Sequence, residues 1–218
     1  MVRERIPETE GVAGETAVES YDRLMKKVIK REYLDTKTII KTGIKNGTAL
    51  EIGPGPGYLG IEWLKKTRDT FLKGLDINKD MLTIAQRNAS EFGVSQRVEY
   101  KLGNAKQLPF DDETFDAVFT NGSLHEWADP IVVFNEVHRV LKNGGRYCIT
   151  DLRRDITLFA RVVLHLVIPR ERRDGFLSSL NASYTQKEIL QMKRDTKLKD
   201  AQVRAEFWTV IINGQKTN

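Results

Sequence analysis

Ala49-Leu50-Glu51-Ile52-Gly53-Pro54-Gly55-Pro56-Gly57-Tyr58-Leu59-Gly60 is the stretch that decides the fold. It predicts a short apolar strand, then a loop with glycine at every second position, then the start of a helix. Because glycine has no side chain, the backbone of such a loop can adopt positive φ and approach a ligand closely. In open α/β sheets, nucleotide-like ligands bind at loops of this kind.

The bulk composition is that of an ordinary globular domain. The chain has 218 residues, of which 40% are hydrophobic and 30% charged. This length suits one large α/β domain with a substantial core. We therefore expect a single domain over 1–218, divided into an N-terminal arm and cap helices (1–45), a ligand-binding core (46–152), a substrate-side insertion (153–184) and a closing helix with strands (185–218).

The sequence also bounds the compartment and the partners. Cys148 is the only cysteine, which excludes an intramolecular disulfide and fits a reducing cytoplasm. The charged N-terminus carries no apolar run typical of a signal peptide, and no stretch reaches the roughly 18 apolar residues of a spanning helix. We expect a cytoplasmic protein with no transmembrane segment. The net charge of +5 is weak evidence for any particular partner.

Around the glycine loop the chain alternates strands and helices. Strands are expected at 48–52, 71–77, 98–102, 115–120 and 146–152, with helices at 58–66, 78–92 and 129–141. This alternation predicts a parallel sheet with helices on both faces. A loosely held arm (1–17), a helix from Ser20 and a short helix at 36–45 are expected before the loop. A helix at 185–193 and one or two closing strands at 201–212 are expected after the core.

The ligand can be narrowed from the residues themselves. Gly55 to Gly60 matches the dinucleotide pattern G-x-G-x-x-G, and Asp76 lies where an acid accepts hydrogen bonds from ribose hydroxyls. Both features fit NAD and S-adenosylmethionine (SAM) alike. However, Pro54 and Pro56 lack the N–H groups that a pyrophosphate needs. Glu51 would repel a pyrophosphate but attract an ammonium and a sulfonium, directly or through water, so the balance favours SAM.

Taken in order, the motifs resemble those of the class I SAM-dependent methyltransferases, with the ubiquinone/menaquinone-biosynthesis type and its small-molecule relatives the most similar. The resemblance covers about residues 45–152. It rests on Glu51-x-Gly53-x-Gly55-x-Gly57, Leu75-Asp76-Ile77, Gly103-Asn104-Ala105 with Leu108-Pro109-Phe110, Phe115–Val118 with Asn121–His125, and Val140–Gly145. The resemblance implies a Rossmann-like, seven-stranded, mostly parallel sheet with helices on both faces and an antiparallel closing strand.

The resemblance also implies which residues bind SAM: Tyr21, Glu51, Gly53, Gly55, Gly57, Asp76, Ile77, Met81, Asn104, Ala105 and Asn121. In this assignment the three glycines line the methionine part of SAM and Asp76 binds the ribose. Ile77 and Met81 sandwich the adenine, and Asn104 with Ala105 contacts its amino edge. Tyr21, from the N-terminal helix, covers the ligand.

His125 follows the strand at 115–120 and is expected at the mouth of the site, while Asn121 is expected beside the methyl group. A histidine there could take a proton from a hydroxyl, thiol or amine, and we name it as the candidate catalytic residue. It could equally hydrogen-bond a loop carbonyl or line the pocket. His138 and His165 are expected to be structural. No His/Cys/Asp grouping has the spacing of metal ligands, so we predict no metal.

The segment at 155–168 is strongly apolar and has arginines around it: Arg153, Arg154, Arg161, Arg170, Arg172 and Arg173. Three interpretations are open. It could be a buried helix with a basic edge, or a lid over an apolar pocket for an anionic group. It could also contact a membrane surface or a second copy in a homodimer.

These observations predict SN2 transfer of the methyl group of SAM to an O, N, S or C nucleophile, with S-adenosylhomocysteine as the product. The expected acceptor is a small molecule, apolar and bearing an anionic group. A methyltransferase acting on RNA or protein, a SAM-binding protein without catalysis and an NAD oxidoreductase are the alternatives. Nucleic acid is not expected, because Asn121-Gly122-Ser123 stands where an Asn-Pro-Pro-Tyr-like motif would indicate an adenine or glutamine amine.

Overall fold

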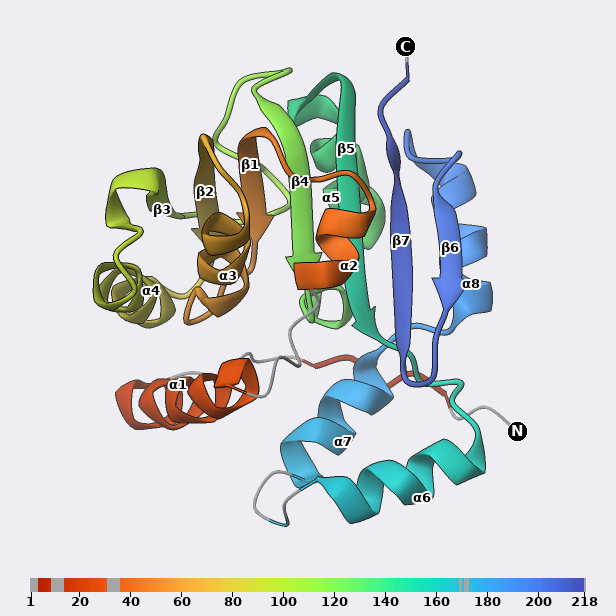
Figure 1. The fold of residues 1–218 in the computed structure, drawn as a ribbon. Coiled ribbons are helices and arrows are strands. Elements are labelled where there is room, and N and C mark those ends of the chain that lie inside the picture. The colour runs from red at the N-terminus through yellow and green to blue at the C-terminus, as the bar shows by residue number, and fades with distance from the viewer. Residues whose placement is uncertain (1–3, 9–13, 31–35, 169, 171–172, 218) are drawn as a thin grey trace.

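The computed structural model describes residues 4–8, 14–30, 36–168, 170 and 173–217. Within them, seven strands form one sheet in the order β3-β2-β1-β4-β5-β7-β6 (Figure 1). The strands are β1 (Gly47–Ile52), β2 (Thr70–Asp76), β3 (Val98–Leu102), β4 (Phe115–Asn121), β5 (Leu141–Leu152), β6 (Gln202–Ala205) and β7 (Thr209–Gln215). Strands β1 to β5 pair in parallel, whereas β7 runs antiparallel to both β5 and β6. The predicted Rossmann-like sheet with an antiparallel closing strand is therefore confirmed.

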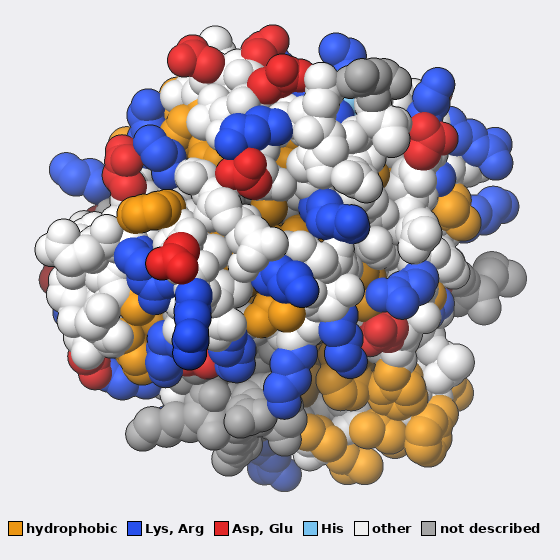
Figure 2. Space-filling view, turned by 45° about the horizontal axis from the view of Figure 1, so that its top comes forward, with side chains coloured by type: hydrophobic (Ala, Val, Ile, Leu, Met, Phe, Trp, Pro, Cys, Tyr) orange, Lys and Arg blue, Asp and Glu red, His pale blue; other side chains and the backbone are white. Residues whose placement is uncertain are grey.

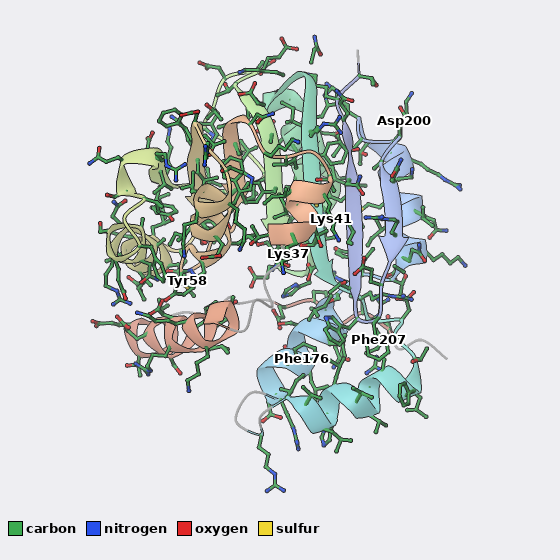
Figure 3. All side chains as sticks on the ribbon, viewed as in Figure 1. Lys37, Lys41, Tyr58, Phe176, Asp200 and Phe207 are labelled. Atoms are coloured by element: carbon green, nitrogen blue, oxygen red, sulfur yellow. The ribbon has the colours of Figure 1, made fainter. Side chains whose placement is uncertain are left out.

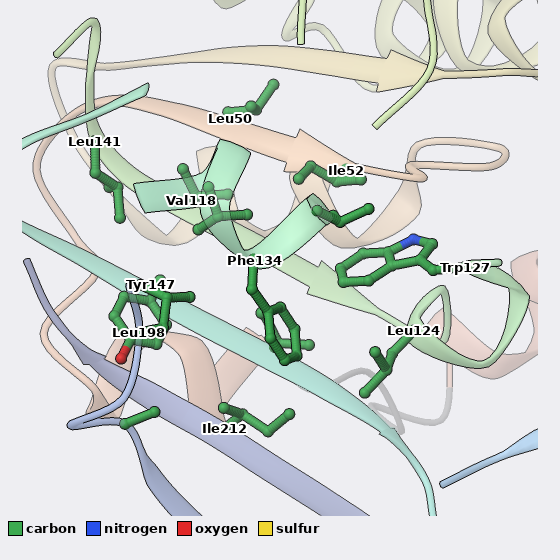
Figure 4. Packing of buried hydrophobic residues seen from close by; sticks show 14 of the residues in the cluster. Leu50, Ile52, Val118, Leu124, Trp127, Phe134, Leu141, Tyr147, Leu198 and Ile212 are labelled. Carbon is green, nitrogen blue, oxygen red and sulfur yellow. The ribbon is translucent and has the colours of Figure 1, made fainter. Parts of the chain in front are cut away.

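Helices cover both faces of this sheet. The helices of the described residues are α1 (Glu15–Lys30), α2 (Thr36–Lys41), α3 (Tyr58–Lys66), α4 (Lys79–Glu91), α5 (Pro130–Val140), α6 (Leu158–Val167), α7 (Arg173–Ala182) and α8 (Gln186–Met192). On one face, α2, α3 and α4 contribute to an apolar cluster that includes the fully buried Trp63 and Phe119. On the other face, α5 and α8 pack around Phe134 (Figure 4). Burial of each such aromatic side chain contributes roughly 1.5–3 kcal/mol.

Local signals set where the helices begin. Asn78 caps α4 by accepting hydrogen bonds from the N–H groups of Asp80 and Met81. Asp129 caps α5, whose first residue is Pro130. These residues were expected in these positions, because capping depends only on neighbours in the sequence.

One helix was not predicted and one local expectation is wrong. The sequence analysis makes no prediction for helix α7, whose glycine and serines weaken the helical signal. Strand β5 begins at Leu141 and not at residue 146, although Asn143-Gly144-Gly145 reads as a turn. The pairing of β5 with β4 shifts register between Phe115 and Ala117, which accommodates the extra residues.

The N-terminal segment also departs from expectation. The sequence predicts a loosely held arm over residues 1–17, and for residues 4–8 this prediction is wrong. The Ile6 N–H donates to the Asn181 carbonyl at 3.1 Å, and Arg5 Nε donates to the Ala182 carbonyl at 2.6 Å. Hydrogen bonds to α7 hold this segment in place. The prediction of a loose arm rested on the low apolar content of the segment, which says nothing about hydrogen bonds. Residues 1–3 and 9–13 lie outside the described residues.

The carboxyl ends of β1, β2, β4 and β5 point to the same edge of the sheet (Figure 1). Helix α1 lies beyond this edge on the β2 side, and α6 with α7 lies beyond it on the β5 side. Tyr58 of α3 holds α1 in place by donating a hydrogen bond of 2.9 Å to Asp22 (Figure 3). Across the described ranges, no helix combines the length and the apolar character required to cross a bilayer.

Candidate active site at the carboxyl edge of the sheet

The glycine loop lies at the point where the sheet reverses its strand order. β1 pairs with β2 on one side and with β4 on the other. In open α/β sheets, this reversal point is where the ligand crevice forms. Gly55 has φ of 51°, and in the described part of the chain a Cβ built on it would meet only Tyr21, at 3.8 Å. Gly57 has φ of 82°, and a Cβ there would come within 2.6 Å of Tyr100 Oη. Gly55 therefore leaves room on the crevice side, whereas Gly57 allows close packing inside the fold.

Asp76 ends β2 and is joined to the glycine loop. Its Oδ2 accepts a hydrogen bond of 3.0 Å from the Gly55 N–H, and its Oδ1 accepts one of 2.9 Å from the Asn78 N–H. Burial raises the pKa of Asp76 and outweighs these hydrogen bonds, which lower it. Each carboxylate oxygen keeps a lone pair that could accept from a ligand hydroxyl. The structure thus brings Gly53, Gly55, Gly57 and Asp76 together, as predicted.

Tyr21 lies over the glycine loop. It packs half-buried on Met81 and Ile84 of α4, and its ring faces the position where Gly55 lacks a side chain. Burial, with smaller contributions from Glu126 and Asp76, raises the pKa of Tyr21 to about 12, so the hydroxyl stays protonated. The expected neighbourhood of Tyr21 is present, and its contact with a ligand stays a prediction.

The residues expected to bind adenine lie in different environments. Ile77 is 72% exposed at the sheet edge, whereas Met81 is buried beneath Tyr21. Asn104 is exposed and its Oδ1 accepts a hydrogen bond from the Lys106 N–H at 2.9 Å. Ala105 packs on the larger apolar cluster. Ile77 is thus the only one of these that offers an open apolar surface to a ring.

Glu51 is buried beneath the start of α3 and does not reach the crevice edge. Its Oε2 has no hydrogen-bond partner among the described residues, and the Gly60 N–H is its backbone partner. Burial raises the pKa of Glu51 to about 8, so this carboxyl is mostly neutral at pH 7. A neutral carboxyl does not attract a cation, so the predicted attraction requires that a cationic ligand lower the pKa of Glu51 when it binds.

His125 lies in the one-turn helix η2 (Leu124–Glu126) after β4, and Asp151 at the end of β5 holds its ring. The His125 Nδ1 lies 2.9 Å from Asp151 Oδ1, and the His125 backbone N–H donates to Asp151 Oδ2 at 2.8 Å. Leu124 and Trp127 are buried in the core on either side and fix the turn. Because the Nδ1–H points at a carboxylate, Nε2 is the basic atom.

The pKa of His125 reflects opposing effects. Burial lowers it, but the hydrogen bond and charge of Asp151, with the charges of Glu126 and Glu8, outweigh burial and raise it above 6.5. Glu8, from the N-terminal segment, places Oε2 at 3.5 Å from His125 Nε2. Asn121 lies on the same edge, and its Oδ1 accepts a hydrogen bond from Thr150 Oγ1 at 2.9 Å.

Sequence reasoning missed Asp151 and Glu8. Asp151 carried a signal, because an acid at the end of a predicted strand lies beside the loop that follows the neighbouring parallel strand. Glu8 carried none. Glu8, His125 and Glu126 each place one candidate metal-ligand atom within 4.8 Å of the others. The sequence did not foresee this grouping, and the absence of a metal stays a prediction.

Carboxylates outnumber cationic groups at this edge. Partial burial raises the pKa of Glu126, and the charges of Glu8, Asp76 and Asp151 raise it further, although His125 opposes them. Such an environment favours a ligand with net positive charge. The Arg5 guanidinium lies at the margin, where Nη2 donates to the His125 carbonyl at 3.0 Å and the group stacks 4.1 Å above the Tyr184 ring.

The strand order, the glycine loop and the acid that ends β2 define the class I SAM-dependent methyltransferase fold. Residues 50–149 match the sequence model of the family described as "Methyltransferase domain". Over these residues the chain carries a domain of the class I SAM-dependent methyltransferases.

Individual relatives agree with this assignment. The chain is 34% identical over 121 residues to the ubiquinone/menaquinone biosynthesis C-methyltransferase UbiE of Enterobacter sp., covering 55% of this chain and 48% of that one. It is 31% identical over 171 residues to the biotin biosynthesis bifunctional protein BioHC of Teredinibacter turnerae, covering 75% and 30%. The chain therefore spans half or less of these curated relatives. A crystal structure from Methanococcus maripaludis, provisionally described as a SAM-dependent methyltransferase, shares the fold with a TM-score of 0.79 at 22% identity, covering 98% of both chains.

Proposed function

We propose that this protein transfers the methyl group of SAM to an O, N, S or C nucleophile of a small molecule and releases S-adenosylhomocysteine. The observation that supports this best is the glycine loop hydrogen-bonded to Asp76 at the reversal point of the sheet. It pairs an open cradle at Gly55 with an acid suited to ribose hydroxyls. The surplus of carboxylates fits the sulfonium and ammonium of SAM better than a pyrophosphate.

The residues present fit SAM in distinct ways. Gly53, Gly55 and Gly57 would hold the methionine part, where a side chain on Gly55 would intrude. Asp76 would hold the ribose and Ile77 would cover the adenine. When bound, SAM supplies a methyl group on a positively charged sulfur, which makes transfer intrinsically favourable. The protein's task is then to align the nucleophile with that methyl group and to exclude water.

His125 is proposed as the general base. Its Nε2 would take the proton of the acceptor as the acceptor's lone pair forms a bond to the methyl carbon. The carbon–sulfur bond breaks and its electron pair stays on sulfur. Asp151 would hold the ring in the required tautomer and stabilise the imidazolium that forms. Since Glu8 lies 3.5 Å from Nε2, the acceptor would have to displace its carboxylate.

The acceptor is proposed to be apolar with an anionic group. Arg5, stacked on Tyr184 beside the His125 carbonyl, offers a cation at the site margin. The name of the UbiE relative refers to ubiquinone and menaquinone, and these quinones are apolar.

We also propose that the protein acts in the cytoplasm without a nucleic-acid partner. Cys148 of β5 is buried and is the single cysteine of the sequence, which fits a reducing compartment.

Calorimetric titration with SAM and with S-adenosylhomocysteine tests this proposal. We expect both to bind, and Asp76→Ala to weaken binding at least about tenfold, because hydrogen bonds to a charged carboxylate are lost. Asp80→Ala is the matched control, since it removes an exposed carboxylate four positions further along the chain and should leave the affinity unchanged. Absence of SAM binding to the wild-type protein, or unchanged affinity in a folded Asp76→Ala variant, would rule the proposal out.

A further inference from the structure

Helix α6 is apolar on two opposite faces, and only one of them is covered. Eight of its ten residues are apolar, the exceptions being Arg161 and His165. Ala160 and Leu164 pack with Leu180 of α7 in a small apolar cluster. The opposite face is open: Leu158 is 78% exposed and Leu166 73%. A helix with apolar side chains on opposite faces is normally buried on both, and this face has no partner among the residues that the structure describes.

The exposed surface continues onto a second part of the chain. Phe207 and Trp208 lie in the turn between β6 and β7. The ring centroid of Phe207 lies 6.5 Å from that of Phe159 of α6 and 5.4 Å from that of Trp208. Phe207 lies near α6 in Figure 3, and hydrophobic side chains gather at the corner of the molecule in Figure 2 that α6 occupies in Figure 1. We call this surface the α6 face; it comprises Leu158, Phe159, Val162, Leu166, Val167, Phe207 and Trp208.

A basic cleft borders the α6 face. The cleft has a volume of about 250 Å³ between α6 and α7, and its walls combine apolar side chains with Arg161, His165 and Arg173. Arg173 Nε donates to the Ile168 carbonyl at 3.1 Å, and its Nη1 lies 3.2 Å from His165 Nε2. His165 is exposed. Two guanidinium groups and an imidazole at an apolar cleft form a site suited to a phosphate group.

We propose that the α6 face docks on a bilayer surface that contains anionic phospholipid. Leucine, phenylalanine and tryptophan side chains would enter the boundary between head groups and acyl chains, where aromatic residues are favoured. The cleft beside them would receive a lipid phosphate. Charge favours this occupant over a second copy, because a two-fold contact through this face would bring the same basic clefts together.

The α6 face and the candidate site lie beyond the same edge of the sheet. Helices α6 and α7 lie beyond the same edge of the sheet as His125 and Asp151 (Figure 1). Docking through α6 therefore turns the mouth of the candidate site toward the lipid. The docking itself does not depend on methyl transfer and is measured without SAM.

Sedimentation with vesicles tests the proposal. Wild-type protein should bind vesicles of phosphatidylcholine with about a third phosphatidylglycerol, and bind pure phosphatidylcholine vesicles more weakly. The double variant Leu158→Gln/Leu166→Gln should lose at least about tenfold in binding, because two apolar side chains no longer enter the interface. Arg173→Gln should lose roughly fivefold on anionic vesicles and little on neutral ones. Both changes replace exposed or half-buried groups, and circular dichroism verifies the fold.

Two controls match these changes elsewhere on the surface. Phe71→Gln replaces an apolar side chain that is 54% exposed at the other end of β2, and Lys41→Gln removes an exposed charge on α2 (Figure 3). Neither should alter vesicle binding. The proposal is overturned if the wild type binds no anionic vesicles, or if the controls weaken binding as much as the α6 changes. It is also overturned if the wild-type protein does not bind vesicles and ultracentrifugation shows that it is a dimer, which the Leu158→Gln/Leu166→Gln variant does not form.

Discussion

Gly55→Leu is expected to abolish measurable SAM binding, a loss of at least about a hundredfold, while the fold persists. Among the described residues, only Tyr21 lies near a Cβ at this position, at 3.8 Å, which leaves room for the start of a side chain. A leucine would fill the space proposed for the methionine part of the ligand. The predicted loss of SAM affinity has two causes: the leucine side chain occupies the space of the ligand, and a non-glycine residue at φ of 51° strains the loop.

Gly93→Leu separates the two contributions. Gly93 follows the C-cap of α4 and has φ of 71°, and no described residue lies within 4 Å of its Cβ position. Both variants pay a similar backbone cost of roughly 1–2 kcal/mol, and only Gly55→Leu blocks the crevice. Thermal denaturation should show comparable losses of stability, and calorimetry should show SAM binding in Gly93→Leu alone. Equal SAM affinities in the two variants would place the ligand elsewhere.

His125→Ala should lower kcat about 10²- to 10⁴-fold, because the acceptor loses the group that takes its proton. The affinity for SAM should stay unchanged, since His125 is not among the residues proposed to hold SAM. His138→Ala is the matched control on α5 and should be silent. The measurement is the rate of label transfer from methyl-labelled SAM to the acceptor fraction. If the His125→Ala variant transferred label as fast as the wild type, the His125–Asp151 pair would have only a structural role.

The pH profile distinguishes a base from a structural histidine. Only the neutral imidazole accepts a proton, so the rate should rise with pH through the pKa of His125, which Asp151 helps to raise. Asp151→Asn removes the carboxylate, so this pKa should fall and the acid limb should move to lower pH. The plateau rate should fall as well, because an amide does not stabilise the imidazolium. An acid limb that stays in place would contradict the role given to Asp151.

Much of the fold follows from signals that are local in sequence. The glycine loop, the caps at Asn78 and Asp129 and the apolar strands all depend on neighbouring residues, and the structure has them where the sequence predicts them. Gly55 and Asp76 also meet as expected, because parallel strands end at one edge of the sheet.

What could not be predicted depends on contacts between distant segments. Glu8 lies near His125 because residues 4–8 are hydrogen-bonded to α7. This helix was not predicted from the sequence. Glu51 reads as an acid available to a ligand, but α3 buries it and raises its pKa. The apolar pattern of α6 fits a buried helix as well as an exposed one, and only the fold shows which face is open.

The measurement that tests the central claim most directly is incubation with methyl-labelled SAM and fractionated cell extract, followed by mass spectrometry of whatever gains the label. The account predicts label in a low-mass, apolar and anionic fraction with wild-type protein, and none with Gly55→Leu. Label in RNA or protein would contradict the proposed acceptor. Binding of SAM with no transfer to any fraction would contradict catalysis.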